Sequence, residues 1–241
     1  MPRVKLTVAY DGSGFAGLQS QKSTDNTVIG TFVQALRRLN IETIPVASGR
    51  TDAGVHASGQ VMHLDVPAHW TPEKLHRALN HQLPPAVRIR RVEKAADEFH
   101  ARFDAKRRIY RYVIAQCVPN PFEANLVHFS RPLDRKRLQA AMQLFVGTHD
   151  FDFFKKTGSD VTHYVRTIYR AFVYRRGKYL VLYFEADGFV RSQIRMMVDA
   201  LLKVEAGDMS LRQLKEQIDV QRRHTTGLAP PQGLYLAKVL Y

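Results

Sequence analysis

The order of strand-like and helix-like segments constrains the fold more than any other feature, because the same order occurs twice. In the first half, runs that alternate apolar and polar residues are separated by segments with the apolar spacing of a helix. Strands are predicted at 3–10, 43–47, 60–66 and 87–92, and helices at 27–39 and 71–83. Taken in chain order, these segments give β-α-β-β-α-β, which is typical of a ferredoxin-like, split βαβ arrangement.

The second half follows the same order, although its residues show no similarity to those of the first. It predicts strands at 109–115, 165–174, 179–186 and 234–240, and helices at 134–146, 190–206 and 210–220. The middle two strands form a hairpin about Arg176-Gly177. Two such units can join their sheets edge to edge and leave a cleft along the shared face. We therefore expect an α+β protein in which two ferredoxin-like halves, 1–105 and 106–241, form one largely antiparallel sheet with a central cleft.

Charge indicates the kind of partner. The chain has a formal net charge of +14 and a pI near 10.1, which favours a polyanion, either nucleic acid or an anionic membrane. No apolar run approaches the roughly 18–20 residues of a membrane span, and the start lacks the apolar core of a signal peptide. A single cysteine, Cys117, excludes an internal disulfide framework and a Cys-rich zinc site. These features together predict a cytoplasmic, nucleic-acid-binding protein with no membrane association.

A loop rich in small residues separates two predicted strands of the first half. Its sequence is Gly49-Arg50-Thr51-Asp52-Ala53-Gly54-Val55-His56-Ala57. The glycines permit tight or left-handed backbone conformations, and loops held between strands often carry binding and catalytic residues. We take Asp52 as the candidate reactive group and Arg50 as its helper. The alternative is a tight turn in which Asp52 caps a backbone N–H.

A second candidate combines basic and aromatic residues over 99–112. Tyr110 and Tyr112 share one face of a predicted strand, whereas Arg111 points to the other. Aromatic rings that stack on bases and guanidinium groups that pair with phosphates suit RNA. The alternative is an amphipathic strand with both tyrosines in the core.

A third candidate lies at the start of the helix predicted at 190–206. Arg191 and Arg195 are one turn apart there, although positive charge is disfavoured at a helix N-terminus. Such a broken local rule suggests pairing with a carboxylate or a phosphate. Arg195 adjoins the apolar Ile194, so we expect it to be the inward one. The alternative is a solvated pair.

Two weak motifs suggest cofactors. Residues 12–17 match G-x-G-x-x-G, but a polar loop follows instead of a helix, and Leu36-Arg37-Arg38 stands where a dinucleotide site needs an acid. Asp52 and His56 could form a metal site with His63 or His100, but no H-x-x-x-H or H-E-x-x-H spacing is present. We therefore expect neither a nucleotide cofactor nor a metal.

The loop at 49–57 resembles the signature loop of the TruA family of tRNA pseudouridine synthases. Further blocks match in family order: Tyr10-Asp11-Gly12, Phe15-Ala16-Gly17-Leu18-Gln19, Phe99-His100-Ala101-Arg102-Phe103, Arg108, Tyr110-Arg111-Tyr112, Gly188-Phe189, Ile194-Arg195 and Gly233-Leu234-Tyr235-Leu236. The blocks span nearly the whole chain. The resemblance implies the pseudouridine synthase fold and the isomerisation of uridine to pseudouridine in the anticodon stem-loop of tRNA.

The resemblance also implies roles for four residues. Asp52 becomes the nucleophile and Arg195 the arginine paired with it. Arg50 helps to hold the target base out of the stack, and Tyr110 packs on that base. It further implies a homodimer that binds tRNA and works without metal or cofactor.

Three positions depart from the family pattern, and three other functions compete with the one it implies. Leu18 stands where Trp is common, Arg191 where His is frequent in bacterial members, and Asp199 where Gly is frequent. The main alternative is a catalytically silent RNA-binding protein on the same fold. That alternative does not explain Asp52, because a carboxylate repels phosphate. A metal-dependent nuclease using Asp52 and His56, and a nucleotide-dependent oxidoreductase, are the other two.

Overall fold

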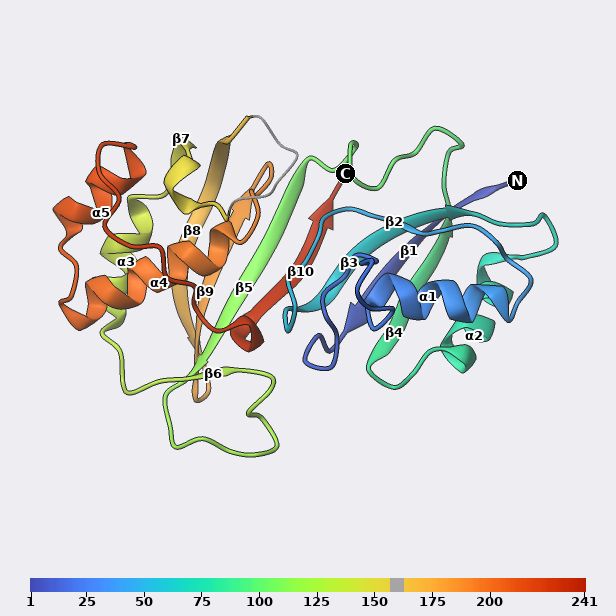
Figure 1. Ribbon diagram of the computed structural model, residues 1–241, viewed down its shortest axis with the longest axis horizontal. Helices are drawn as coiled ribbons and strands as arrows, with labels where there is room; N and C mark the ends of the chain where they lie inside the picture. The colour runs from blue at the N-terminus through green and yellow to red at the C-terminus, as the bar shows by residue number, and fades with distance from the viewer. Residues whose placement is uncertain (157–162) are drawn as a thin grey trace. The chain divides into compact units, whose positions relative to one another are not determined.

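The computed structural model describes residues 1–156 and 163–241, shown in Figure 1. Its strands are β1 Arg3–Tyr10, β2 Val46–Ala47, β3 His56–Asp65, β4 Val87–Lys94, β5 Arg107–Ala115, β6 His128–Phe129, β7 Gly147–Asp150, β8 Val165–Arg176, β9 Tyr179–Ala186 and β10 Leu234–Leu240. Its α-helices are α1 Val28–Arg37, α2 Pro72–Gln82, α3 Arg135–Gln143, α4 Gln193–Ala206 and α5 Leu211–Ile218. Short 3₁₀ turns occupy Asp152–Phe154 and Pro231–Gly233.

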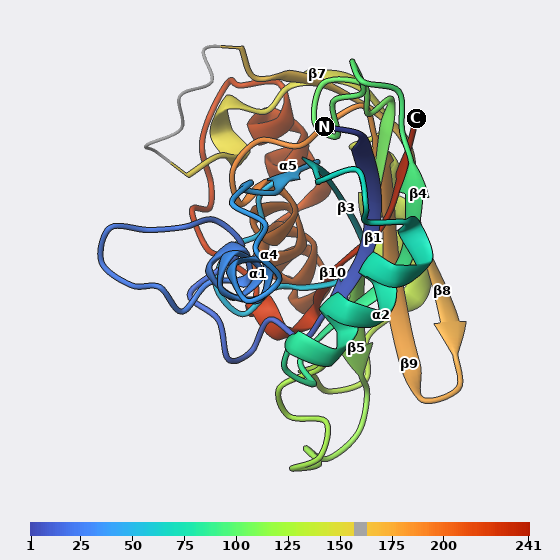
Figure 2. The ribbon, with the colours of Figure 1, turned by 90° about the vertical axis from the view of Figure 1, so that its right-hand side faces the viewer.

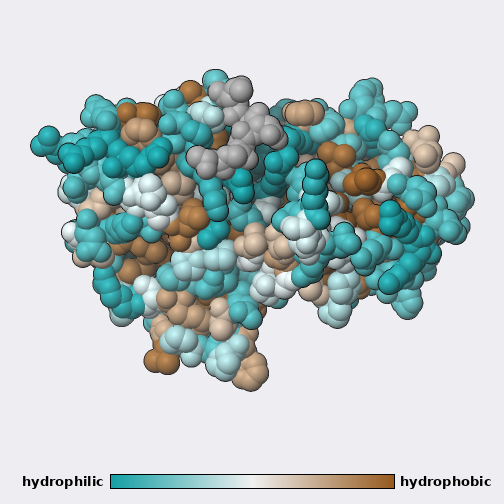
Figure 3. Space-filling model, viewed as in Figure 1, coloured by the Kyte–Doolittle hydropathy of each residue, from teal (hydrophilic) through white to brown (hydrophobic). Residues whose placement is uncertain are grey.

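Contacts divide the chain into two compact units. The first comprises Met1–Lys106 together with Leu236–Tyr241, and the second comprises Arg107–Tyr235. Most of the closing strand β10 therefore belongs with the N-terminal residues. On the face drawn in Figure 3, hydrophilic residues predominate on the surface of each unit.

The first unit is built around β1. This strand pairs antiparallel with β3 on one side and β4 on the other, while the short β2 pairs with β3. Val4, Leu6 and Val8 alternate along β1 and are fully or almost fully buried, as period-two patterning requires. Helix α2 begins as predicted, because Thr71 accepts a hydrogen bond from Lys74 N and Pro72 occupies the first turn.

The second unit is built around β9. It pairs antiparallel with β5 and β8, and β8 pairs antiparallel with β7. The short β6 pairs with β5 in parallel. In Figure 2, α4 and α5 lie on one side of β8 and β9. Tyr112 and Phe184 are fully buried in this unit.

The prediction of an α+β protein with largely antiparallel strand pairing is confirmed. Several details differ. Strand β3 begins at His56 rather than at residue 60, so the last residues of the predicted loop 49–57 are already strand. The strand expected at 43–47 shrinks to Val46–Ala47, since Pro45 cannot donate to a strand ladder. The helix expected from residue 190 begins at Gln193. The short strands β6 and β7 were not predicted, since runs of two and four residues give no readable alternation.

Among the residues described, none of the helices is both long and apolar enough to pass through a membrane.

Candidate active site

Asp52 lies on the loop between β2 and β3, within the first unit. Its side chain is half-buried, and its carbonyl oxygen accepts a hydrogen bond from Val55 N at 3.1 Å. Gly54 closes this turn with φ of 76°, a conformation that glycine adopts without steric cost. Asp52 therefore lies in a tight turn and is partly exposed.

Residues that follow β1 fix the backbone just before Asp52. Thr51 is buried; its Oγ1 lies 2.7 Å from the Tyr10 hydroxyl, and its carbonyl oxygen accepts from Leu18 N at 3.1 Å. Burial raises the pKa of Tyr10 to about 12, so its hydroxyl stays neutral. Gly17 has φ of 116°, and a Cβ there would lie 3.1 Å from the Thr51 carbonyl oxygen. The segment after β1 thus braces the Asp52 loop.

The same segment accounts for the G-x-G-x-x-G match at 12–17. Gly12 N donates to His56 Nδ1 at 3.0 Å, and a Cβ on Gly12 would collide with the carbonyl of Val55. Helix α1 begins only at Val28, so no helix opens within the motif as a dinucleotide site requires. Gly12 and Gly17 serve close backbone packing beside Asp52 instead.

A buried glutamine holds the entry to the loop. Gln60 is fully buried; its Oε1 accepts from Ser48 Oγ at 2.7 Å and its Nε2 donates to Gly49 O at 2.9 Å. The next residue, Arg50, is exposed. Arg50 therefore extends from a fixed backbone. No pattern in the residues identified Gln60 as part of this support.

Tyr110 lies on β5, in the second unit. It is buried, with 7% of its surface exposed, and its ring meets Phe189 edge to face at a centroid distance of 5.2 Å. In the register of β5 with β9 it stands opposite Phe184. Tyr112, two residues along, points to the same face, as predicted.

Arg195 is held in the first turns of α4 by a segment from near the end of the chain. Its Nε donates to Ala229 O at 2.8 Å, and Ala229 N donates to Arg195 O at 3.0 Å. Next to this contact, the Tyr112 hydroxyl donates to Pro230 O at 2.9 Å. Burial raises the pKa of Tyr112, and the positive charge of Arg195 opposes that rise. The second unit therefore brings Arg195 to the face of β5 that carries Tyr110 and Tyr112.

The expectation that Arg191 and Arg195 lie one turn apart on the same helix is wrong, because α4 does not include Arg191. Ser192 adopts φ of 60°, and the helix begins one residue later. Arg191 consequently lies in the turn before α4, where it is exposed. Left-handed serines are uncommon, so the periodicity of the sequence did not reveal this break.

The metal site considered from Asp52, His56 and His63 does not assemble. His56 and His63 are the first and eighth residues of β3, and at about 3.3 Å per residue they lie more than 20 Å apart. His63 Nδ1 instead accepts from Ala101 N at 3.1 Å. Within 1–156 and 163–241, no three His, Cys, Asp or Glu side chains gather as metal ligands would.

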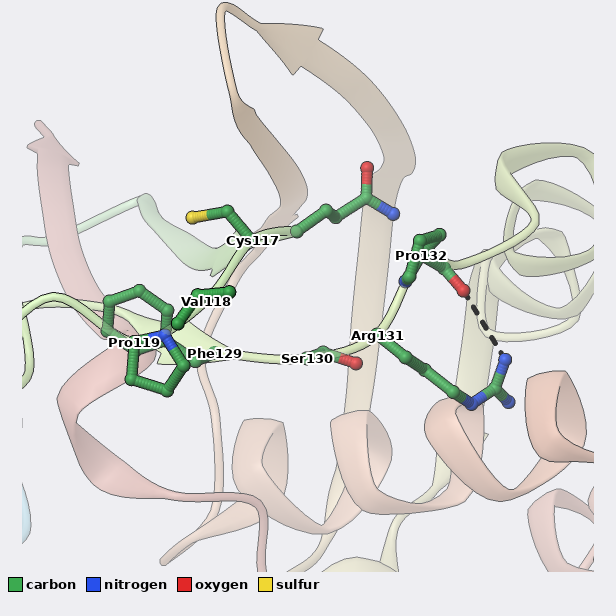
Figure 4. Close-up of a pocket in the computed structure, with 8 residues that line it drawn as sticks. Cys117, Val118, Pro119, Phe129, Ser130, Arg131 and Pro132 are labelled. Atoms are coloured by element: carbon green, nitrogen blue, oxygen red, sulfur yellow. Dashed lines mark hydrogen bonds between the residues drawn. The ribbon is translucent and has the colours of Figure 1, made fainter.

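An open cavity of about 540 Å³ lies elsewhere in the second unit (Figure 4). It is lined by Gln116, Cys117, Val118, Pro119, Phe129, Ser130, Arg131 and Pro132. None of the four predicted site residues lines it.

Comparison with known proteins identifies the class to which this fold and the Asp52 loop belong. Residues 6–104 and 141–241 match the family described as tRNA pseudouridine synthase, so the architecture is the pseudouridine synthase fold. Proteins called tRNA pseudouridine synthase A are similar over the full chain. The one from Wolinella succinogenes is 41% identical over all of this chain and 95% of its own length. Those from Helicobacter hepaticus and Exiguobacterium are each 38% identical, over 100% and 98% of their lengths. The chain belongs to the tRNA pseudouridine synthase family.

Proposed function

We propose that this protein isomerises uridine to pseudouridine in the anticodon stem-loop of tRNA. The observation that carries the proposal is the half-buried Asp52 on a loop braced by Tyr10, Gly17 and Gln60, in a chain that matches the family over both units. A carboxylate held on a rigid backbone is suited to attack, because its position is fixed before the substrate arrives.

The reaction conserves atoms and electrons. The N1–C1′ bond of the target uridine breaks, the detached uracil turns, and a C5–C1′ bond forms while the C5 proton is lost and N1 gains one. Ionised Asp52 attacks either C1′ of the ribose or C6 of the base. No oxidant or reductant enters this balance, so the reaction needs no redox cofactor. We propose that no metal takes part either, as the family resemblance implies.

Three further residues complete the proposed site. Arg195 pairs with Asp52, and its positive charge keeps the carboxylate ionised in a desolvated pocket. Tyr110, already packed on Phe189, presents a ring on which the target uracil stacks. The exposed Arg50 occupies the gap left when the base leaves the helix stack, a step that costs a few kcal/mol.

The partner is tRNA, and the protein acts as a cytoplasmic homodimer. The net charge of +14 supports an RNA partner, because the negatively charged phosphates of RNA attract Lys and Arg side chains. The homodimer and the cytoplasmic location rest on the family resemblance and are part of the proposal.

Tritium release from tRNA labelled at C5 of uridine tests the proposal, since the C5 proton leaves only when the new glycosidic bond forms. We expect release with the wild-type protein, with or without EDTA, and none above background with Asp52→Asn, which still binds tRNA. A silent RNA-binding protein would release no tritium at all. Turnover of Asp52→Asn near the wild-type rate would remove Asp52 from the mechanism.

A further inference from the structure

The residues that hold Arg195 form a network inside the second unit. The Ala229 contact is two-sided, since the backbone N–H and carbonyl of Ala229 both bond to Arg195. The position of the Arg195 side chain thus depends on the position of the segment 225–230. This segment has no regular secondary structure, so contacts from neighbouring side chains must fix its position.

Asp199, one turn beyond Arg195 on α4, holds the start of the segment. Its Oδ2 accepts from Thr225 Oγ1 at 2.7 Å and lies 3.0 Å from Lys203 Nζ. Thr225 Oγ1 in turn accepts from Gly227 N at 3.2 Å and from Lys203 Nζ. The hydroxyl therefore donates its one proton to Asp199 and uses both of its acceptor positions.

Gly227 provides the space that Asp199 needs. A Cβ at Gly227 would collide with both carboxylate oxygens and the carboxyl carbon of Asp199. The side chain thus lies directly against the backbone of the segment. A carboxylate at 199 and a residue without a side chain at 227 fit each other.

Gln217 of α5 holds the other side of Thr225. Its side chain is fully buried; Oε1 accepts from the backbone N–H groups of His224 and Thr225 at 2.8 and 2.9 Å. Its Nε2 donates to Thr225 O at 3.1 Å. The hydrogen bonds between buried Gln217 and buried Thr225 favour one geometry of the segment, because a shift would leave buried polar groups unpaired.

We propose that Asp199 is a positioning residue for Arg195: through Thr225 it fixes the segment whose Ala229 carbonyl orients the arginine side chain. This inference rests on the proposed role of Arg195 as the partner of Asp52. The departure from the frequent Gly at 199 is then a functional feature of this chain.

The first test removes each link and reads catalysis separately from binding. For Asp199→Ala and Thr225→Val we expect kcat to fall about 10- to 100-fold, the range expected when a reacting group is slightly misplaced. KM for tRNA and the melting temperature change much less. Thr225→Ser, which keeps the hydroxyl, recovers most of the loss.

Asp219→Asn is the matched control. Asp219 also pairs with a lysine one turn away, Lys215, but is exposed on the end of α5. We expect its kcat to equal that of the wild type. Equal losses of kcat in Asp219→Asn and Asp199→Ala would overturn the proposal. So would a loss of kcat in Asp199→Ala that is fully accounted for by a lower melting temperature.

The second test is a double-mutant cycle with Arg195→Lys under single-turnover conditions. If Asp199 acts through Arg195, adding Asp199→Ala to Arg195→Lys lowers the rate by less than about threefold. Independent, multiplicative losses would overturn the positioning role while leaving the proposed site intact. Full activity of Arg195→Lys alone would instead remove Arg195 from the site, so the two failures are distinguishable.

Discussion

Gly14 and Gly17 stand in one loop, yet their surroundings differ. Gly17 has φ of 116° and faces the Thr51 carbonyl, whereas a Cβ on Gly14 would meet nothing within 4 Å. Glycines cannot be ranked from the sequence alone, because their importance depends on what packs against them. The structure makes Gly17 a support for the loop that carries Asp52.

For Gly17→Ala we expect a loss of about 1–3 kcal/mol in the free energy of unfolding, because the side chain is strained at this φ. We also expect kcat to fall, since the Ala Cβ pushes on the backbone before Asp52. Chemical denaturation and tritium release measure the two effects. Gly14→Ala is the control and changes the free energy of unfolding by less than about 0.5 kcal/mol; equal effects at both positions would contradict the bracing role.

Arg195→Lys tests the guanidinium itself. A lysine carries the charge but cannot donate to Ala229 O while presenting a planar fork to a carboxylate. We expect most of the kcat to be lost with an unchanged circular dichroism spectrum. Arg191→Lys, in the exposed turn before α4, is expected to keep the wild-type rate. An Arg195→Lys variant with full turnover would show that charge alone suffices.

Helices α3 and α4 are joined by one buried carboxylate. Glu205, near the end of α4, accepts from Asp134 N at 3.0 Å and from the Arg131 guanidinium at 2.8 Å. Asp134 is itself the N-cap of α3. The side chain of Glu205 therefore accepts a hydrogen bond from the backbone at the start of a neighbouring helix. No local sequence pattern predicts this contact.

For Glu205→Ala we expect the free energy of unfolding to fall by about 1–3 kcal/mol, since the part-buried N–H of Asp134 and the Arg131 guanidinium both lose their acceptor. Urea denaturation measures this change. Glu42→Ala, at an exposed carboxylate, serves as the control and is expected to stay within about 0.5 kcal/mol of the wild type. Similar midpoints for both variants would show that water replaces the lost bond.

Local rules predicted most elements, but long-range backbone contacts were outside their reach. The helix start at Thr71-Pro72 and the turn at Arg176-Gly177 could be predicted from these residue types alone. The structure confirms both. Asp52 could be picked out because an acid between glycines has no packing role. In contrast, the Ala229 contact with Arg195 uses main-chain atoms, which leave no trace in the residue types.

At the scale of the molecule, chain order and spatial grouping disagree at the C-terminus. Residues Leu236–Tyr241 belong with the first unit, although a division by sequence assigns them to the second. The contacts that place them are remote in sequence: Tyr241 donates to Ala101 O at 2.8 Å, and Lys106 N donates to Leu240 O at the same distance. Hydrophobic periodicity gives a strand but not its neighbours, so this grouping could not be read from the sequence.

The net charge of the whole protein governs the salt dependence of its affinity for RNA. With 36 Lys and Arg against 22 Asp and Glu, binding to tRNA releases counterions from the phosphates that the protein neutralises. We expect the logarithm of the association constant to fall linearly with the logarithm of salt concentration. The slope is about −0.7 to −0.9 for each phosphate neutralised, and several phosphates take part.

Asp52→Asn separates this long-range attraction from the chemistry. Removing one negative charge from a basic protein does not weaken its attraction for RNA, so the variant retains the wild-type salt slope and binds tRNA at least as tightly. Filter binding across a salt series, with wild type and variant measured together, gives both slopes. A flat salt dependence in the wild type would mean that the basic surface is not what holds tRNA. A flat slope in Asp52→Asn alone would mean that the substitution disturbs the RNA-binding surface as well as the reaction, because a residue that acts only on the bond-making step leaves phosphate contacts unchanged.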